Sequence, residues 1–392
     1  MRTSIYLCSF VVLFFIQACQ ASAPQEKEEI VMGAEQTKKY LHLLDNKRVG
    51  LVVNHTSMLG DVHLVDFLRE KGVNVVKIFT PEHGFRGTAD AGEKVESTMD
   101  VETGLPIVSL YGSNKKPSAA SVADVDVLIF DIQDVGVRFY TYISTMHYMM
   151  ETCAEQHKLA IVFDRPNPNG HYVDGPILNM KFTSFVGMHP IPVVHGLTVA
   201  ELALMINGEG WLAGGLKCRL EVVPMQNYHH KLPYSLPVKP SPNLPNDRSI
   251  NLYPSTCFFE GTKMSLGRGT QYPFQILGYP DASFGDFCFT PKSIVGMSKN
   301  PPHEQKECCG VDLREGEFLQ RLDLSFLLHF YAKWNKKEDF FTSFFNLLAG
   351  NDVLVKQIKD GKTEDEIRIS WQPGLDKYHE IRSKYLLYKE PQ

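Results

Sequence analysis

The sequence predicts an α/β protein whose N-terminal half is a doubly wound parallel sheet. Five short apolar runs alternate with helical patterns in this half, an order typical of parallel strands joined by crossover helices. Polar or charged side chains directly follow each run. Because parallel strands end at the same edge of a sheet, we expect these side chains to gather where such sheets bind ligands.

The predicted strands are apolar and rich in β-branched residues; in chain order they cover residues 49–53, 75–79, 106–110, 125–130 and 159–163. Residues 63–71 place Leu64, Phe67 and Leu68 on one helical face and end before Gly72, which predicts an amphipathic helix. Further helices are predicted over residues 36–44, 119–123 and 137–157.

A domain boundary is predicted near residue 240. Before it, a capping box formed by Thr198 and Glu201 opens a helix over residues 199–207, and a sixth strand is predicted at 220–224. Five prolines then crowd residues 233–245, a density typical of a boundary or a rigid connection. We therefore divide the chain into residues 33–240 and 241–392, and the second part closes with helical patterns at 322–334, at 339–348 and from Thr363 onward.

The N-terminus has the pattern of a secretory signal. Arg2 precedes an apolar run over residues 5–16, which is too short to span a bilayer. The run ends in Ile16-Gln17-Ala18-Cys19, which resembles a bacterial lipobox. Residues 1–19 are thus predicted as a signal with Cys19 lipidated, and residues 20–32 as a tether; the alternative is an ordinary signal with an incidental cysteine. We expect an exported periplasmic or outer-membrane lipoprotein that touches the membrane only through this lipid.

Composition and spacing exclude several functions. The net charge is −5, the pI is about 6.3 and no basic cluster is present, which argues against a nucleic-acid partner. No G-x-G-x-x-G, Walker loop, G-x-S-x-G, C-x-x-C or H-E-x-x-H occurs, so we expect no cofactor and no metal. The six cysteines after residue 19 match no disulfide framework, which leaves either one or two bridges or buried free thiols.

Glu82 is the first candidate catalytic residue. It lies in Thr80-Pro81-Glu82-His83-Gly84-Phe85-Arg86-Gly87, directly after a predicted strand. A carboxyl group becomes a proton donor near neutral pH when partial burial raises its pKa, and the apolar strand and Phe85 favour such burial. His83 would orient it or bind substrate. The alternative for Glu82 is a structural salt bridge.

A second group of candidates follows the strand at 125–130. Asp131, Gln133 and Asp134 put two carboxylates and an amide in one loop, a density suited to sugar hydroxyls and an oxocarbenium-like transition state. We expect one carboxylate to cap the next helix and the other to face a cleft. Arg138 and Tyr140 follow, and Arg138 either reaches an anionic substrate group or forms a surface salt bridge.

The remaining binding candidates also follow predicted strands or lie in loops. Arg165 offers a forked donor suited to a carboxylate, and the prolines beside it rigidify its loop. Arg268 lies between two glycines in the second domain and can close on a substrate. The full set of predicted substrate-binding residues is Asn54, Arg86, Gln133, Arg138, Tyr140, Asp164, Arg165, Asn167 and Arg268.

Several motifs in order resemble the bacterial exo-β-N-acetylmuramidases, from about Gly33 to the C-terminus. They include Pro81-Glu82-His83-Gly84-Phe85-Arg86-Gly87, the run from Phe130 to Tyr142, Asp164-Arg165-Pro166-Asn167-Pro168, Pro242-Asn243-Leu244-Pro245, Glu260-Gly261-Thr262, Gly267-Arg268-Gly269-Thr270 and Ser370-Trp371. The resemblance implies a Rossmann-like subdomain beside a smaller α+β subdomain, with the active cleft between them. It also implies hydrolysis of terminal non-reducing N-acetylmuramic acid from peptidoglycan fragments, with Glu82 as the catalytic acid.

The resemblance leaves the second catalytic group open. Asp131 and Asp134 are the candidates, and assistance by the substrate's 2-acetamido group is the alternative. N-acetylmuramic acid carries a lactyl carboxylate that N-acetylglucosamine lacks, so selectivity requires a cation; the available guanidinium groups are those of Arg86, Arg138, Arg165 and Arg268. Two other functions stay open, namely a non-catalytic cell-wall-binding lipoprotein and another hydrolase, such as an amidase or esterase.

Overall fold

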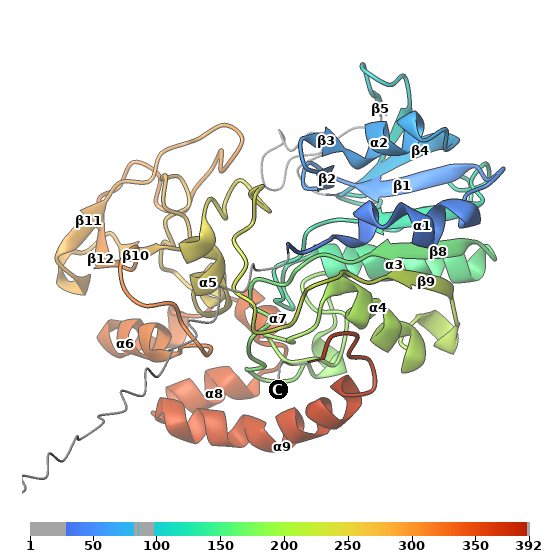
Figure 1. Ribbon diagram of the computed structural model, residues 1–392. Coiled ribbons are helices and arrows are strands. Elements are labelled where there is room, and N and C mark those ends of the chain that lie inside the picture. The colour runs from blue at the N-terminus through green and yellow to red at the C-terminus, as the bar shows by residue number, and fades with distance from the viewer. Residues whose placement is uncertain (1–28, 82–84, 86–97, 390–392) are drawn as a thin grey trace, which may run out of the picture.

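The computed structural model describes residues 29–81, 85 and 98–389 (Figure 1). Its main sheet has seven strands in the order β5-β6-β4-β1-β7-β8-β9. Their bounds are Thr98–Met99 (β5), Pro106–Ser109 (β6), Val75–Thr80 (β4), Val49–Val53 (β1), Val127–Asp131 (β7), Leu159–Phe163 (β8) and Arg219–Val223 (β9). All are parallel except β5, which pairs antiparallel with β6. The six parallel strands follow the Rossmann order 3-2-1-4-5-6, which confirms the predicted fold class.

Side chains alternate between the two faces of each strand, so the sheet has one hydrophobic core on each face. In β1, Val52 packs with the core cluster that contains Leu128 and Phe130, whereas Leu51 and Val53 pack on the opposite face. Both faces are buried because helices cover them (Figure 1), which is why these strands are continuously apolar. The helices of this half are α1 (Thr37–Tyr40), α2 (Leu64–Glu70), α3 (Tyr142–Glu155) and α4 (Val199–Gly208), and a small hairpin pairs β2 (Met58–Leu59) with β3 (Val62–His63).

Several predicted boundaries differ from those observed. Helix α3 begins at Tyr142 rather than at residue 137, and residues 119–123 form turns rather than a helix. The capping box of α4 is confirmed, since Thr198 Oγ1 accepts from the Glu201 amide and the Glu201 side chain accepts from the Thr198 amide. The predicted sixth strand is β9, which pairs parallel with β8.

The C-terminal part is smaller and mixed. It contains a three-stranded antiparallel sheet in the order β10-β12-β11 (Figure 1). Its elements are α5 (Asp247–Thr256), β10 (Ile276–Tyr279), β11 (Phe287–Phe289), β12 (Cys308–Asp312), α6 (Ser325–Lys333), α7 (Phe344–Ala349), α8 (Val353–Lys359) and α9 (Glu364–Arg382). The predicted capping box at Thr363 is present at the start of α9.

The two parts share one continuous core. The ring of Phe139, which precedes α3, contacts the rings of Tyr253 and Phe258 in the C-terminal part. The end of the chain then returns to the first part, where the Tyr378 hydroxyl donates to the carbonyl of His195 at 2.7 Å. The proposed division at residue 240 stays a prediction, because these contacts do not mark a boundary.

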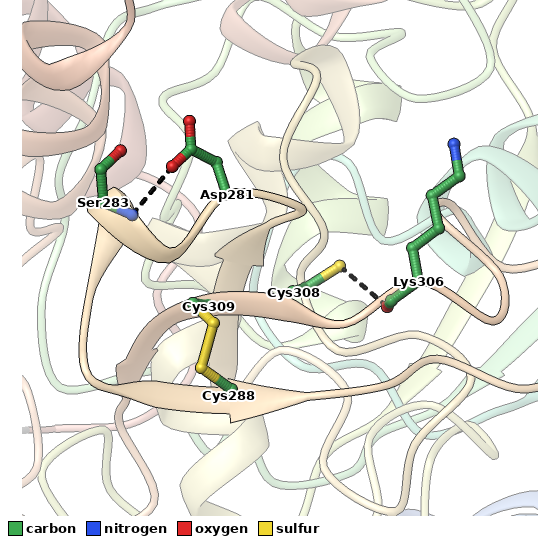
Figure 2. The surroundings of a disulfide bond; sticks show 6 residues. All are labelled: Asp281, Ser283, Cys288, Lys306, Cys308 and Cys309. Carbon is green, nitrogen blue, oxygen red and sulfur yellow. Dashed lines mark hydrogen bonds between the residues drawn. A yellow bond between two sulfur atoms is a disulfide. The ribbon is translucent and has the colours of Figure 1, made fainter.

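One disulfide joins Cys288 on β11 to Cys309 on β12, two residues that lie directly opposite each other in the ladder (Figure 2). The other four cysteines among the described residues are buried free thiols, and Cys308 Sγ donates to the carbonyl of Lys306. Cys288, Glu307 and Cys309 form the one cluster of metal-type ligands found in the described part of the chain. Its two sulfur atoms are bonded to each other, so they are not thiolate ligands.

Candidate active site

The polar side chains predicted to gather at one edge do so at the topological switch point of the sheet. Strands β1 and β7 are neighbours in the middle of the sheet. The strands β4 and β6 follow on the side of β1, and β8 and β9 follow on the side of β7, so the strand order reverses between β1 and β7. Asn54 and Thr56 follow β1, and Asp131 ends β7. Ligands of open α/β sheets bind in the crevice that forms at such a point.

Asp131 and Arg165 form a buried ion pair at this edge. Nε and Nη2 of Arg165 donate to the two carboxylate oxygens of Asp131 at 2.6 and 2.8 Å, and Nη2 also donates to the carbonyl of Met58 at 3.1 Å. Asp131 is fully buried and Arg165 is 5 % exposed. The fork expected to bind a substrate carboxylate thus binds a carboxylate of the protein itself.

A hydrogen-bond chain joins the loops after β1, β7 and β8. Asn54 Oδ1 accepts from the amide and the hydroxyl of Thr56, at 2.9 and 2.6 Å, and Thr56 Oγ1 accepts from the amide of Gln133 at 3.0 Å. Gln133 Nε2 donates to the carbonyls of Asp134 and Pro166, at 2.8 and 2.7 Å. Asn54 and Gln133 therefore fix the shape of the edge, and Nδ2 of Asn54 is buried with no partner among the described residues.

Asp134 is buried beside His195. Its Oδ2 accepts from the amide of Gly136 at 2.7 Å and lies 3.8 Å from His195 Nε2, whereas its Oδ1 has no partner in the described part of the chain. Burial raises the pKa of Asp134 to about 7 and lowers the pKa of His195 to about 3. Asp134 therefore holds a proton up to near neutral pH. The hydrogen bond from the Gly136 amide to Asp134 closes a turn. Neither Asp131 nor Asp134 caps α3, so the prediction that one of them would do so is wrong.

Asp134→Asn should stabilise the protein above neutral pH. A carboxyl whose native pKa is raised contributes stability that is fully present below its unfolded pKa of 3.8 and lost as pH rises through about 7. The asparagine carries no charge. The difference in unfolding free energy between the variant and wild type should therefore grow from pH 3.8 to about pH 7 and reach at most about 4 kcal/mol, since one pKa unit corresponds to about 1.4 kcal/mol. Urea midpoints of both proteins at about pH 5 and about pH 8 measure this; an equal difference at both values would contradict it.

Arg138 lies in the interior and not in a cleft. Its guanidinium is fully buried and donates from Nη1 to the carbonyls of Pro176 and Ile191, at 2.7 and 2.8 Å, and from Nη2 to those of Leu348 and Ala349, at 2.9 and 2.8 Å. Burial lowers its pKa to about 9. This geometry contradicts the predicted contact with an anionic substrate and also the alternative of a surface salt bridge. Arg138 instead connects the end of α7 to the backbone of Pro176 and Ile191 in the first part of the chain.

Asp164 and Asn167, also predicted to bind substrate, are used within the fold. Asp164 Oδ1 accepts from the amide of Ala200 at 3.0 Å, and its Oδ2 accepts from Thr198 Oγ1 at 2.7 Å and from the Tyr388 hydroxyl. These bonds fix the start of α4 and the C-terminal segment. Burial, together with the nearby Glu201 carboxylate, raises the pKa of Asp164 to about 7.

Asn167 joins the loop after β8 to the segment before α4. Its Nδ2 donates to the carbonyl of Leu197 at 2.9 Å, and its Oδ1 accepts from the amide of Asn169 at 2.9 Å. Gly136 has a φ of +76°, and a Cβ there would lie 2.1 Å from Asn167 Oδ1. Only glycine therefore lets the two loops approach this closely.

A first cavity of about 170 Å³, the Arg268 cavity, brings both parts of the chain together. It is lined by Tyr140 and Tyr142 before α3, by Ser241 and Asn243 after the prolines, and by Glu260 and Arg268 of the C-terminal part. The Tyr140 hydroxyl donates to the carbonyl of Pro240 at 2.6 Å. This arrangement fits a cleft between the subdomains, and it contains Tyr140 and Arg268 from the predicted set.

Arg268 and Asn243 supply the polar groups of this cavity. Nε and Nη2 of Arg268 donate to Glu260 Oε1, the first at 2.9 Å, and no hydrogen bond from Nη1 is found among the described residues. Asn243 Nδ2 donates to the carbonyl of Met297 at 2.8 Å, whereas its Oδ1 is buried without a partner in the described part of the chain. Asn243 is not among the residues predicted to bind substrate; its place between Pro242 and Pro245 is the signal in the sequence that could have indicated it.

A second cavity of about 160 Å³, the Arg165 cavity, lies at the switch point. Thr56, Gln133, Arg165 and Tyr234 line it, together with Met32 from the start of the described chain. Residues 237–241 run between the two cavities, since Val238 lines the second and Ser241 the first. His55 Nε2 and the carbonyl of Lys239 form a hydrogen bond of 2.8 Å that holds this segment against the end of β1.

Glu82, His83 and Arg86 lie outside the described residues, as does Cys19. The residues on either side of Glu82 and His83 are described. β4 ends at Thr80 and pairs with β1, and Pro81 is buried. Phe85 is buried as well, and its ring packs edge-on against that of His63 with centroids 4.8 Å apart. The strand that precedes Glu82 therefore ends at the same edge as Asn54 and Asp131.

Comparison with known proteins decides the family. Residues 49–248 match the family model for the N-terminal part of the exo-β-N-acetylmuramidase NamZ, and residues 251–388 match the model for its C-terminal part. The chain belongs to the NamZ family. A curated relative, the peptidoglycan β-N-acetylmuramidase NamZ of Bacillus subtilis, is 36% identical over 428 residues, which cover 99% of this chain and 100% of the relative.

Two solved structures share the fold of this chain. One crystal structure of a DUF1343 family protein from Bacteroides fragilis has a TM-score of 0.86 and 49% identity, covering 93% of this chain and 100% of that chain. A second DUF1343 protein from the same organism has a TM-score of 0.79 and 31% identity, with the same coverage. Both similarities extend over the sheet and the smaller C-terminal part, which confirms the predicted two-part architecture.

Proposed function

We propose that this protein is an exo-β-N-acetylmuramidase that releases terminal non-reducing N-acetylmuramic acid from peptidoglycan fragments. The observation that carries the proposal is the match along 99% of the chain to a peptidoglycan β-N-acetylmuramidase. A cavity lined by both parts of the chain, with a guanidinium and several hydroxyl and amide groups, supports it. Glycosidases need such a density of donors and acceptors to hold a sugar during bond cleavage.

In this proposal Glu82 protonates the glycosidic oxygen as the leaving chain departs. β4 ends beside β1, which favours a position for Glu82 near the gathered polar groups. The terminal sugar binds in the Arg268 cavity, where Nη1 of Arg268 binds the lactyl carboxylate and Asn243 Oδ1 accepts from a hydroxyl or the acetamido N–H. The candidates for the second catalytic group stay Asp131, Asp134 and the substrate's own acetamido group.

A pair of chromogenic glycosides tests the proposal. The wild-type protein should release the chromophore from the β-glycoside of N-acetylmuramic acid and act at least about 30-fold less efficiently on that of N-acetylglucosamine, because the loss of a buried carboxylate partner costs about 2–5 kcal/mol. The measurement is kcat/KM for each glycoside. A cell-wall-binding protein without activity would release nothing from either, and an amidase or esterase would act only on peptide or ester bonds.

Export and lipid anchoring form a further part of the proposal. Arg2, the apolar residues 5–16 and the Ile16-Gln17-Ala18-Cys19 sequence support a lipoprotein signal with Cys19 as the modified residue. None of the helices in the described chain is both long and apolar enough to cross a bilayer. Cys19→Ser should move the protein from the membrane fraction to the soluble fraction of the cell. An unchanged distribution between the fractions would contradict the lipid anchor.

A further inference from the structure

The Cys288–Cys309 disulfide lies beside a carboxylate on the smaller sheet. Cys288 on β11 pairs directly with Cys309 on β12, and Glu307 is two residues before Cys309. Side chains two residues apart in an extended chain point to the same side. One ligand atom from each of the three residues lies within 4.8 Å of the other two. Two sulfur atoms and one carboxylate oxygen therefore meet on one side of the sheet.

This cluster is accessible from solvent. Cys288 and Glu307 are exposed, whereas Cys309 is 3% exposed. No hydrogen bond or ion pair of the Glu307 side chain is found in the described part of the chain, so its carboxylate is available to a ligand. Figure 2 shows Cys308 and the side chain of Lys306 on the other side of β12 from the disulfide. A metal ion in solution can thus reach Glu307 and the Cys288 sulfur without a change of fold.

Reduction of the disulfide would turn the two sulfur atoms into ligands. A dithiol reductant gives two electrons and two protons to the S–S bond, which breaks into two thiols, and the reductant itself becomes a disulfide. A metal ion that binds both sulfur atoms then displaces the two thiol protons, because the thiolate is the ligand. No other residue has to move between the two strands, since the backbone pairing of β12 with β10 and β11 does not depend on the disulfide.

The ligand set suits zinc. Soft thiolates select zinc or copper(I), and a carboxylate as the third ligand favours the harder zinc ion. Zn–S bonds of about 2.3 Å at tetrahedral angles place the two sulfur atoms about 3.8 Å apart. Rotation of the exposed Cys288 side chain can supply this separation once the S–S bond is broken.

We propose that Cys288, Cys309 and Glu307 form a zinc site that exists only while the Cys288–Cys309 disulfide is reduced. Three protein ligands hold the ion and water takes the fourth tetrahedral position. β11 and β12 are then joined either by the disulfide or by the ion, according to the redox state. No motif in the sequence indicates the site, because the register of two strands brings its ligands together.

This inference is independent of the proposed function. None of the three ligands lines the Arg165 cavity or the Arg268 cavity. Activity on the N-acetylmuramic acid glycoside and metal binding are therefore separate measurements, and either one can fail without the other.

Titration of the purified protein with Zn²⁺ tests the site. One sample stays oxidised, and a second is reduced with a phosphine that is then removed in oxygen-free buffer. Calorimetry should show no binding to the oxidised protein and one Zn²⁺ per reduced chain. Co²⁺ in place of Zn²⁺ should give the sulfur-to-cobalt charge-transfer absorption of thiolate ligands in the reduced protein alone. Circular dichroism of the reduced protein should match that of the oxidised protein.

Glu307→Gln keeps the disulfide and removes one ligand. Its reduced form should bind Zn²⁺ at least about tenfold more weakly, because even partners of the ligands typically contribute about 10–100-fold to metal affinity. The matched control is Glu304→Gln, the same substitution at an exposed position nearby, which should bind Zn²⁺ as wild type does. Equal affinities in Glu307→Gln and Glu304→Gln would remove the carboxylate from the site.

Two cysteine variants identify the sulfur ligands. Cys288→Ser should lose the cobalt charge-transfer band under reducing conditions. Cys308→Ser should keep it, since Cys308 Sγ donates to the carbonyl of Lys306 at 3.6 Å on the other side of β12. Reduced wild type that binds no Zn²⁺, or that loses its fold, would overturn the proposal. Zinc binding that survives in Cys288→Ser or disappears in Cys308→Ser would contradict it as well.

Discussion

Glu82→Gln should lower kcat/KM on an N-acetylmuramic acid glycoside by about 10²–10⁴-fold, the usual contribution of a general acid. Glutamine has nearly the same shape but carries no acidic proton for the leaving oxygen. The fold should persist, because the strand before it is held by pairing with β1 and β6 and by the core around Ile78 and Phe79. Steady-state kinetics and a thermal melt of the purified variant measure the two quantities together.

The matched control is Glu70→Gln, the same substitution at an exposed position at the end of α2. Its kinetics and its melting temperature should equal those of wild type. Near wild-type activity in Glu82→Gln would remove Glu82 from the mechanism. A large fall in its melting temperature would assign Glu82 to the alternative role, a structural salt bridge.

Asp131→Asn should destabilise the protein by about 3–5 kcal/mol, the usual cost of leaving one member of a buried ion pair without its partner. The carboxylate accepts two hydrogen bonds from Arg165, and both side chains are buried. Arg165→Met should cost a similar amount. The double variant Asp131→Asn/Arg165→Met should cost less than the sum, since no charge is then left buried. Urea unfolding of the four proteins gives this coupling energy directly.

The chain offers a matched control for this cycle. Arg48 binds Asp126 through the same two-pronged geometry, at 3.0 and 2.8 Å, but their side chains are 46% and 35% exposed. Asp126→Asn should therefore cost much less than Asp131→Asn. Equal losses would contradict the argument from burial. A folded Asp131→Asn variant whose activity is at least about 10²-fold lower would instead identify Asp131 as the second catalytic carboxylate.

The six parallel strands of the sheet could be predicted from the sequence almost to the residue, whereas β5 lies in a stretch predicted as a polar loop. β1 and β8 match the predicted ranges. Each is a continuous apolar run between polar loops, and a strand covered on both faces is what removes all of its side chains from water. The start of α3 could not be predicted in this way. Residues 137–141 continue a helical apolar pattern, but their backbone forms a loop whose Arg138 amide donates to the carbonyl of Val193. Helix α5 was missed because prolines surround it and Pro254 lies inside it.

The location of the site could be predicted from the sequence, but the contacts of its individual side chains could be predicted less well. Asp131 ends β7 and Arg165 follows the neighbouring strand β8, so their pairing follows from the strand order and could have been inferred. The burial of Arg138 could not, because its four carbonyl partners come from residues 176, 191, 348 and 349, which only the tertiary fold brings together. The same holds for the Cys288–Cys309 pairing, which depends on the register of β11 and β12.

The most direct measurement is a crystal structure of Glu82→Gln with a disaccharide of N-acetylmuramic acid β-linked to N-acetylglucosamine. We expect the terminal sugar in the Arg268 cavity and its lactyl carboxylate on Arg268. The glycosidic oxygen should lie within about 2.6–3.2 Å of the side chain at position 82, as general-acid catalysis requires. A disaccharide bound with its glycosidic oxygen remote from that side chain would contradict the account.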